Sequence, residues 1–202
     1  EVSSTYLVMS PEEQLAGAFR VIWDELGGSL DGVIRAGTMP ADARLLHALS
    51  SRSLAEVLRG MNKFSNNLMS QLIFLTVGAE RFGAPGTLAK ARDAVTDWAL
   101  ENGLDIGTLR IDNGSGLSRD IAITARALAE LLRAAYFTPQ MPEFIASLPI
   151  IGVDGTMRRQ LRNTPLVGKG YIKTGSIDDV NALAGYVQDK HDRRWVVVSL
   201  LN

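Results

Sequence analysis

The order in which helical and strand patterns follow one another most constrains how this chain can fold. Apolar residues recur at helical spacing through the first three quarters of the sequence, and the pattern then changes to that of strands. Residues 168–174, 180–188 and 193–201 are predicted strands, and the polar loop 189–192 makes the last two a hairpin. Helices followed by an antiparallel meander predict an α+β fold, with helices packed on or beside the sheet.

Local signals define where the predicted helices begin and end. Ser10 and Glu13 form a capping box around Pro11, and Ser53 with Glu56 forms a second one. The predicted helices cover residues 11–26, 53–62, 67–82, 88–101, 125–137 and about 143–147; residues 31–36 and 44–49 are expected to be short strands or extended segments, and residues 104–123 to be irregular.

The apolar positions of two helices predict which sides face the core. Periodicity places one set of side chains on a single face of the helix 67–82 and another set inward on the helix 88–101. The first set is Leu68, Leu72, Leu75, Thr76 and Ala79, and the second is Ala91, Val95, Trp98 and Ala99.

Composition excludes several classes of protein. The 202 residues are 46% hydrophobic and 21% charged, which argues against disorder and coiled coils. The formal net charge of -1 argues against a general partner that is nucleic acid or an anionic membrane. There is no cysteine and there are only two histidines, so we expect no disulfide, no metal site and no cofactor. The apolar runs are too short to span a bilayer.

Two short motifs can carry chemistry. Ser65-Asn66-Asn67 precedes an apolar helix, where serine and asparagine are also common caps, and such a triplet occurs by chance in about every second chain. Lys173-Thr174-Gly175-Ser176 ends a predicted strand, and its tripeptide occurs by chance in only about one chain in forty. Lysine is scarce, with five Lys against 16 Arg, which makes Lys173 unusual for a solvated strand.

The residue types suggest one site. A serine hydroxyl and an amide between two helices can relay protons and hold a substrate carbonyl. A lysine and a threonine on a strand can bind a terminal carboxylate, and glycine leaves room for the substrate backbone to lie along the strand. We therefore expect Ser65 and Asn67 to converge with Lys173 on one cleft, although about a hundred residues separate them.

The sequence resembles the class C low-molecular-mass penicillin-binding proteins, the periplasmic D-alanyl-D-alanine carboxypeptidase/endopeptidases. The resemblance covers roughly residues 11–202 and rests on ordered segments. They are Met61–Leu68, Asp112–Arg119, Val153-Asp154-Gly155-Thr156, and Lys173–Ser176 followed by Asn181–Tyr186.

This resemblance implies a transpeptidase-like fold, in which a helical subdomain (about 53–150) packs against an antiparallel sheet (strands in about 165–202). It implies hydrolysis of peptidoglycan stem peptides through an acyl-serine, and inhibition by β-lactams. The implied catalytic residues are Ser65, Asn67 and Lys173. The implied substrate-binding residues are Thr174, Gly175, Ser176, Ser115, Gly116 and Leu117.

One element of the family is absent from these residues: no Ser-x-x-Lys occurs in the sequence. We therefore expect 1–202 to be the C-terminal part of a longer periplasmic or otherwise extracytoplasmic protein, with the nucleophile upstream. The piece alone should be inactive and should leave the sheet face around Tyr186, Trp195 and Val197 uncovered. The alternatives are a non-catalytic peptidoglycan-binding relative without the serine, and an unrelated α+β domain.

Overall fold

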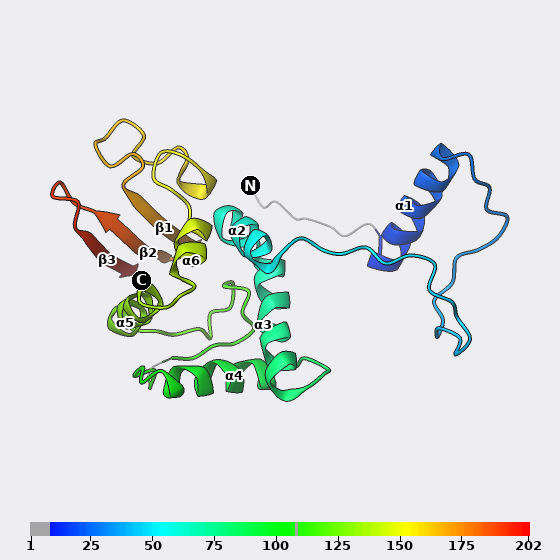
Figure 1. Cartoon of the computed structure of the whole chain (residues 1–202), viewed down its shortest axis with the longest axis horizontal. Coiled ribbons are helices and arrows are strands. Elements are labelled where there is room, and N and C mark those ends of the chain that lie inside the picture. The colour runs from blue at the N-terminus through cyan, green and yellow to red at the C-terminus, as the bar shows by residue number, and fades with distance from the viewer. Residues whose placement is uncertain (1–8, 108) are drawn as a thin grey trace. The chain divides into compact units, whose positions relative to one another are not determined.

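The computed structural model describes residues 9–107 and 109–202, and it divides the chain into two compact units with a boundary between Ser50 and Ser51 (Figure 1). Within these described ranges, the first unit contains one helix, and the second contains the other helices and the strands. Among the described residues, no helix has the length and apolar character needed to cross a membrane.

In the first unit, helix α1 (Pro11–Glu25) begins at the predicted capping box, in which Ser10 and Glu13 bond to each other's backbone N–H. The ring of Trp23 stacks on that of Phe19, and its Nε1 donates to the carbonyl of Ser29. The segments 31–36 and 44–49 contain no strand, so they are irregular connections rather than parts of a sheet. Neither has a partner strand among the described residues that could satisfy a ladder of backbone bonds.

The second unit confirms the predicted order of helices followed by an antiparallel meander. Its elements are α2 (Leu54–Phe64), α3 (Asn67–Phe82), α4 (Leu88–Glu101), α5 (Ala125–Tyr136), α6 (Met141–Ser147), the short 3₁₀ helix η1 (Gly155–Met157), β1 (Gly170–Ile177), β2 (Val180–Gln188) and β3 (Arg194–Leu201). The strands form one antiparallel sheet in the order β1-β2-β3. Strand β1 runs through the whole Lys173–Ser176 motif, whereas the sequence predicted that the strand ends at Thr174.

Helices α5 and α6 cover one face of the sheet (Figure 1). Tyr186 of β2 is the centre of this contact: it is 1% exposed, and its hydroxyl donates to the carbonyl of Leu132 on α5 at 2.6 Å. Burial raises the pKa of Tyr186 to about 12. The expectation that Tyr186 lies on an uncovered face was wrong, because alternation along β2 turns it toward these helices. Trp195 of β3 is 53% exposed, as expected.

Small residues join α3 to α4, and of the set predicted to face inward on α4 the two alanines, Ala91 and Ala99, are buried as expected. Gly78 is buried, and a Cβ there would lie 2.6 Å from the backbone nitrogen of Ala91. Leu68 and Leu72, expected to face the core, are 65% and 54% exposed, and Trp98 is 41% exposed. Close approach of two backbones at glycine and alanine decides the packing here, and hydrophobic periodicity does not detect such contacts.

Candidate active site

The junction between α2 and α3 consists of a single turn residue followed by a helix cap. Ser65 adopts a left-handed conformation (φ 52°, ψ 48°), and its N–H closes the last turn of α2 on the carbonyl of Met61. Asn66 then caps α3, because its side chain accepts from the N–H of Met69. A non-glycine residue with positive φ costs of order 1–3 kcal/mol, and such residues concentrate at functional sites. The conformation of Ser65 thus directs its hydroxyl away from both helices and toward the sheet.

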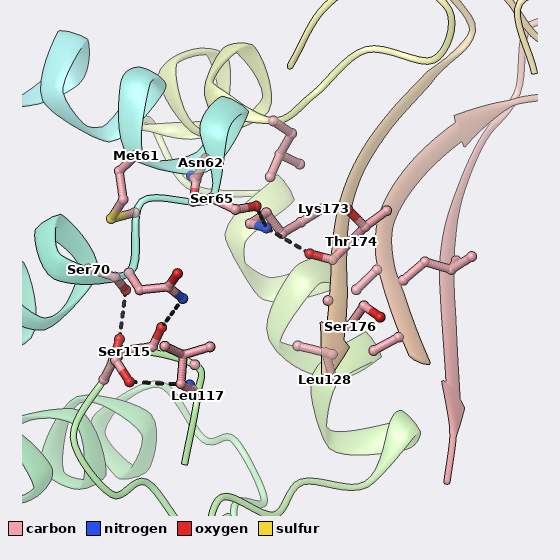
Figure 2. Close-up of a pocket in the computed structure, with 18 of the residues that line it drawn as sticks. Met61, Asn62, Ser65, Ser70, Ser115, Leu117, Leu128, Lys173, Thr174 and Ser176 are labelled. Atoms are coloured by element: carbon pink, nitrogen blue, oxygen red, sulfur yellow. Dashed lines mark hydrogen bonds between the residues drawn. The ribbon is translucent and has the colours of Figure 1, made fainter. Parts of the chain in front are cut away.

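Lys173 reaches that hydroxyl from β1. Its Nζ donates to Ser65 Oγ at 2.5 Å and to the carbonyl of Thr174 at 2.7 Å, and Figure 2 shows the two side chains pointing toward each other. The expected convergence of the two motifs is confirmed. Burial lowers the pKa of Lys173 below the usual lysine value, because the charged ammonium loses part of its hydration.

A glycine-rich loop forms the third side of the site. Asn67 Nδ2 donates to the carbonyl of Ser115 at 2.6 Å, and Ser70 Oγ donates to that of Gly114 at 2.7 Å. Gly114 has φ 72°, and a Cβ there would lie 2.6 Å from Phe74, so the loop can approach α3 only with glycine at this position. The loop backbone is thus bonded to the first turn of α3.

These three sides enclose a pocket of about 670 Å³. All the residues predicted for the site line it: Ser65, Asn67, Ser115, Gly116, Leu117, Lys173, Thr174, Gly175 and Ser176. Figure 2 shows Leu117 on the loop side and Ser176 on the strand side. In the part of the chain that the structure describes, no three His, Asp or Glu side chains gather as a metal site would require.

Strand β1 offers a partly free edge to this pocket. One edge pairs with β2 over its whole length, and on the other edge Ile172 donates to the carbonyl of Pro149 at 2.8 Å. Gly175 has no close neighbour in the chain, since a Cβ there would meet only the Ala182 Cβ at 3.8 Å. Packing among the described residues therefore does not explain why glycine stands at this position.

Sequence reasoning missed several polar contacts around the site. Arg92 of α4 donates to the carbonyls of Ile111 and Asp112, both at 2.9 Å, and so secures the start of the glycine-rich loop. Lys63 of α2 pairs with Asp154 at 2.6 Å. Lys63 and Asp154 both belong to segments that carried the family resemblance. The scarcity of lysine was the only other signal in the sequence that could have marked Lys63.

A cleft that brings Ser-x-Asn, Lys-Thr-Gly and a glycine-rich loop together is typical of penicillin-recognising serine acyltransferases. The model of the D-Ala-D-Ala carboxypeptidase 3 (S13) family matches residues 1–202, and the chain belongs to this family. The fold is accordingly α+β and corresponds to part of a penicillin-binding protein fold.

Individual relatives of the chain agree with this family membership. The chain is 32% identical over 194 residues to a D-alanyl-D-alanine carboxypeptidase of Actinomadura sp. (strain R39), covering 92% of this chain and 36% of the relative. It is 27% identical over 180 residues to the D-alanyl-D-alanine carboxypeptidase DacB of Haemophilus influenzae, covering 88% and 38%. The crystal structure of penicillin binding protein 4 (dacB) from Haemophilus influenzae superposes with a TM-score of 0.83 at 25% identity, covering 96% of this chain and 44% of that one. The chain thus spans little more than a third of the length of these curated relatives.

Proposed function

We propose that residues 1–202 supply the Ser-x-Asn and Lys-Thr-Gly parts of the active site of a serine D-alanyl-D-alanine carboxypeptidase/endopeptidase. Its substrates would be peptidoglycan stem peptides, its inhibitors β-lactams, and its location outside the cytoplasm. The observation that carries this proposal is the hydrogen bond between Lys173 and Ser65 inside a pocket lined by every residue predicted for the site. Family membership gives the reaction class.

In this proposal the chain is the C-terminal part of a transpeptidase-like domain. Residues about 53–150 would form its mainly helical subdomain and residues about 165–202 would supply sheet strands. No Ser-x-x-Lys occurs in the 202 residues, so the nucleophilic serine would come from a part of the same protein outside them. The pocket would be completed by that part.

The strand side of the pocket would bind the substrate terminus. The charged Lys173 and the hydroxyl of Thr174 offer donors to a terminal carboxylate, and a charge-assisted bond in a shielded site is among the stronger polar contacts. The peptide backbone would lie along β1 as an added strand, in the space that Gly175 leaves open. Asn67, whose Nδ2 faces the loop at Ser115, would orient the substrate carbonyl on the opposite side.

The serine side would move protons. The nucleophilic serine oxygen attacks the carbonyl carbon of the penultimate D-alanine, and the bond to the terminal D-alanine nitrogen breaks. The proton lost by that serine passes through the Ser65 hydroxyl to the leaving amine, for which Ser65 is oriented by Lys173. Water then adds to the acyl-serine, which releases the shortened peptide as an acid and restores the serine.

The proposal is tested with the complete gene product that contains this chain. After incubation with benzylpenicillin, intact mass spectrometry should show one covalent adduct, and peptide mapping should place it on a serine outside residues 1–202. Residues 1–202 expressed alone should form no adduct, because they lack an activated serine. A complete protein that binds muropeptide without any adduct would instead identify a non-catalytic peptidoglycan-binding relative.

A further inference from the structure

The segment Val153-Asp154-Gly155-Thr156 has no part in the chemistry proposed above, although it lies between the two halves of the site. Asp154 Oδ2 accepts from Lys63 Nζ at 2.6 Å, and Lys63 Nζ also donates to the carbonyl of Leu148 at 3.0 Å. Lys63 is two residues before Ser65 on α2, and its side chain is only 12% exposed. A charge so buried is retained only where it is paired and hydrogen-bonded.

The same segment is bonded to β1. The second oxygen of Asp154, Oδ1, accepts from the N–H of Ile150 at 2.8 Å. On the strand side, Ile151 donates to the carbonyl of Gly170 at 2.9 Å, and Ile172 donates to that of Pro149 at 2.8 Å. Asp154 therefore bonds both to Lys63 near the end of α2 and to Ile150, whose two neighbours in the chain bond to the strand that carries Lys173.

The two residues after Asp154 add contacts to both sides. Gly155 has φ 55°, and a Cβ there would lie 2.5 Å from the carbonyl oxygen of Lys63, so glycine permits contact with the α2 backbone. The hydroxyl of Thr156 lies 3.2 Å from that of Thr174, within hydrogen-bond distance. One short segment thus contacts Lys63, which lies two residues before Ser65, and also Thr174 on β1.

We propose that Lys63 and Asp154 form a clamp that sets the position of Ser65 relative to Lys173 and Thr174, and that both are positioning residues for acylation. This inference rests on the proposed function for its kinetic consequence. The clamp acts by geometry: the Ser65 hydroxyl must meet both Lys173 and the leaving amine, and a displacement of about 1 Å can slow a reaction by about a hundredfold.

The test compares stability with acylation in the complete protein. Asp154→Asn leaves the Ile150 bond possible but leaves the charge of Lys63 unpaired, so it should lower both the unfolding midpoint and the acylation rate constant. The double variant Lys63→Met with Asp154→Asn removes both charges and should recover stability. Its first-order acylation rate constant should nevertheless stay about tenfold or more below wild type, while the dissociation constant of the initial β-lactam complex changes less than about threefold.

A matched pair of glycine variants isolates the geometry from the charge. Gly155→Ala should slow acylation because it pushes η1 away from α2. Gly60→Ala lies on α2 itself and should not, because beyond the backbone of that helix and the adjoining residues no atom lies within 4 Å of the added Cβ. Recovery of both stability and acylation rate in the double variant would overturn the clamp and leave a purely structural ion pair.

A wild-type protein that forms no adduct would contradict the proposed function rather than the clamp. The crystal structure of the double variant then decides: the clamp predicts loss of the hydrogen bond between Ser65 and Lys173, and its retention at wild-type length overturns the inference.

Discussion

Two ion pairs of similar length connect different parts of the molecule. Lys63 and Asp154, 2.6 Å apart with side chains 12% and 35% exposed, join α2 to the segment beside the pocket. Arg81 and Glu101, 2.5 Å apart and 39% and 56% exposed, join the ends of α3 and α4. Arg81 lies 14 residues along α3 from Asn67, which is roughly 20 Å of helix. We therefore expect a change to the Lys63–Asp154 pair to affect the site more than a change to the Arg81–Glu101 pair at the far ends of α3 and α4.

Among substitutions at the pocket and in the distant α3–α4 region, Lys173→Ala in the complete protein is expected to have the largest effect on acylation. Acylation by benzylpenicillin should fall about a hundredfold or more, because a charge-assisted contact in a shielded site is worth about 3 kcal/mol. Stopped-flow or gel measurements of adduct formation check this. Lys190→Ala, in the exposed hairpin loop, is the matched control and should acylate at the wild-type rate. A wild-type rate for Lys173→Ala would show that Lys173 does not bind the carboxylate.

The dependence of the acylation rate on pH tests the same role of Lys173 as a charged group. An ordinary lysine titrates near 10.5, and burial lowers the pKa of Lys173 below this value. Lys173 then loses its charge at a lower pH than ordinary lysines, so acylation should decline as the pH rises through that lowered pKa. The residual rate of Lys173→Ala should lack this alkaline decline. A wild-type rate that stays level up to pH 10.5 would contradict the requirement for a charged lysine.

Asn67→Ala should have the next largest effect. It removes the 2.6 Å bond to Ser115 and the proposed contact with the substrate carbonyl, so acylation should slow by about tenfold or more. Asn102→Ala is the control, because Asn102 makes a similar bond to the carbonyl of Trp98 at the end of α4, away from the pocket. Equal rates for the two variants would remove Asn67 from the site.

Gly78→Ala changes the contact between α3 and α4 instead of the pocket. The added Cβ would lie 2.6 Å from the backbone of Ala91, and such overpacking costs about 1–3 kcal/mol. Denaturant unfolding of the complete protein should show this loss, while the folded variant should acylate within about threefold of wild type. A large acylation defect without a loss of stability would mean that the hairpin geometry acts on the site.

Glu101→Gln is the smallest test. Its pair with Arg81 is exposed to solvent, and such pairs contribute little to stability. Neither the unfolding midpoint nor the acylation rate should change measurably. If Glu101→Gln slowed acylation as much as Asp154→Asn, the two ion pairs would not differ in their effect on the site.

The sequence alone predicted the elements and the two motifs of the site because these depend on local signals. Capping boxes at Ser10 and Ser53 defined helix starts, and alternation defined the strands. The inward position of Ala91 and Ala99 on α4 was predicted, but the close fit of Gly78 against Ala91 was not, because glycine leaves no apolar signal in the sequence.

Polar contacts between residues far apart in the sequence could not be predicted from the sequence either. Lys63 and Asp154 are 91 positions apart, and neither residue type nor spacing indicates their pairing. The hydroxyl of Tyr186 finds its acceptor at Leu132, 54 positions away, and this contact depends on how α5 crosses the sheet. Such pairings follow from the tertiary fold, which local patterns do not specify.

The most direct test of the account is a crystal structure of the complete protein acylated by benzylpenicillin. The account predicts that the drug carboxylate lies within hydrogen-bond distance of Lys173 Nζ and Thr174 Oγ1, and that Ser65 keeps its bond to Lys173 on the opposite side of the acyl-serine. An acyl group whose carboxylate is bound elsewhere, with Lys173 and Thr174 making no contact to the drug, would contradict it.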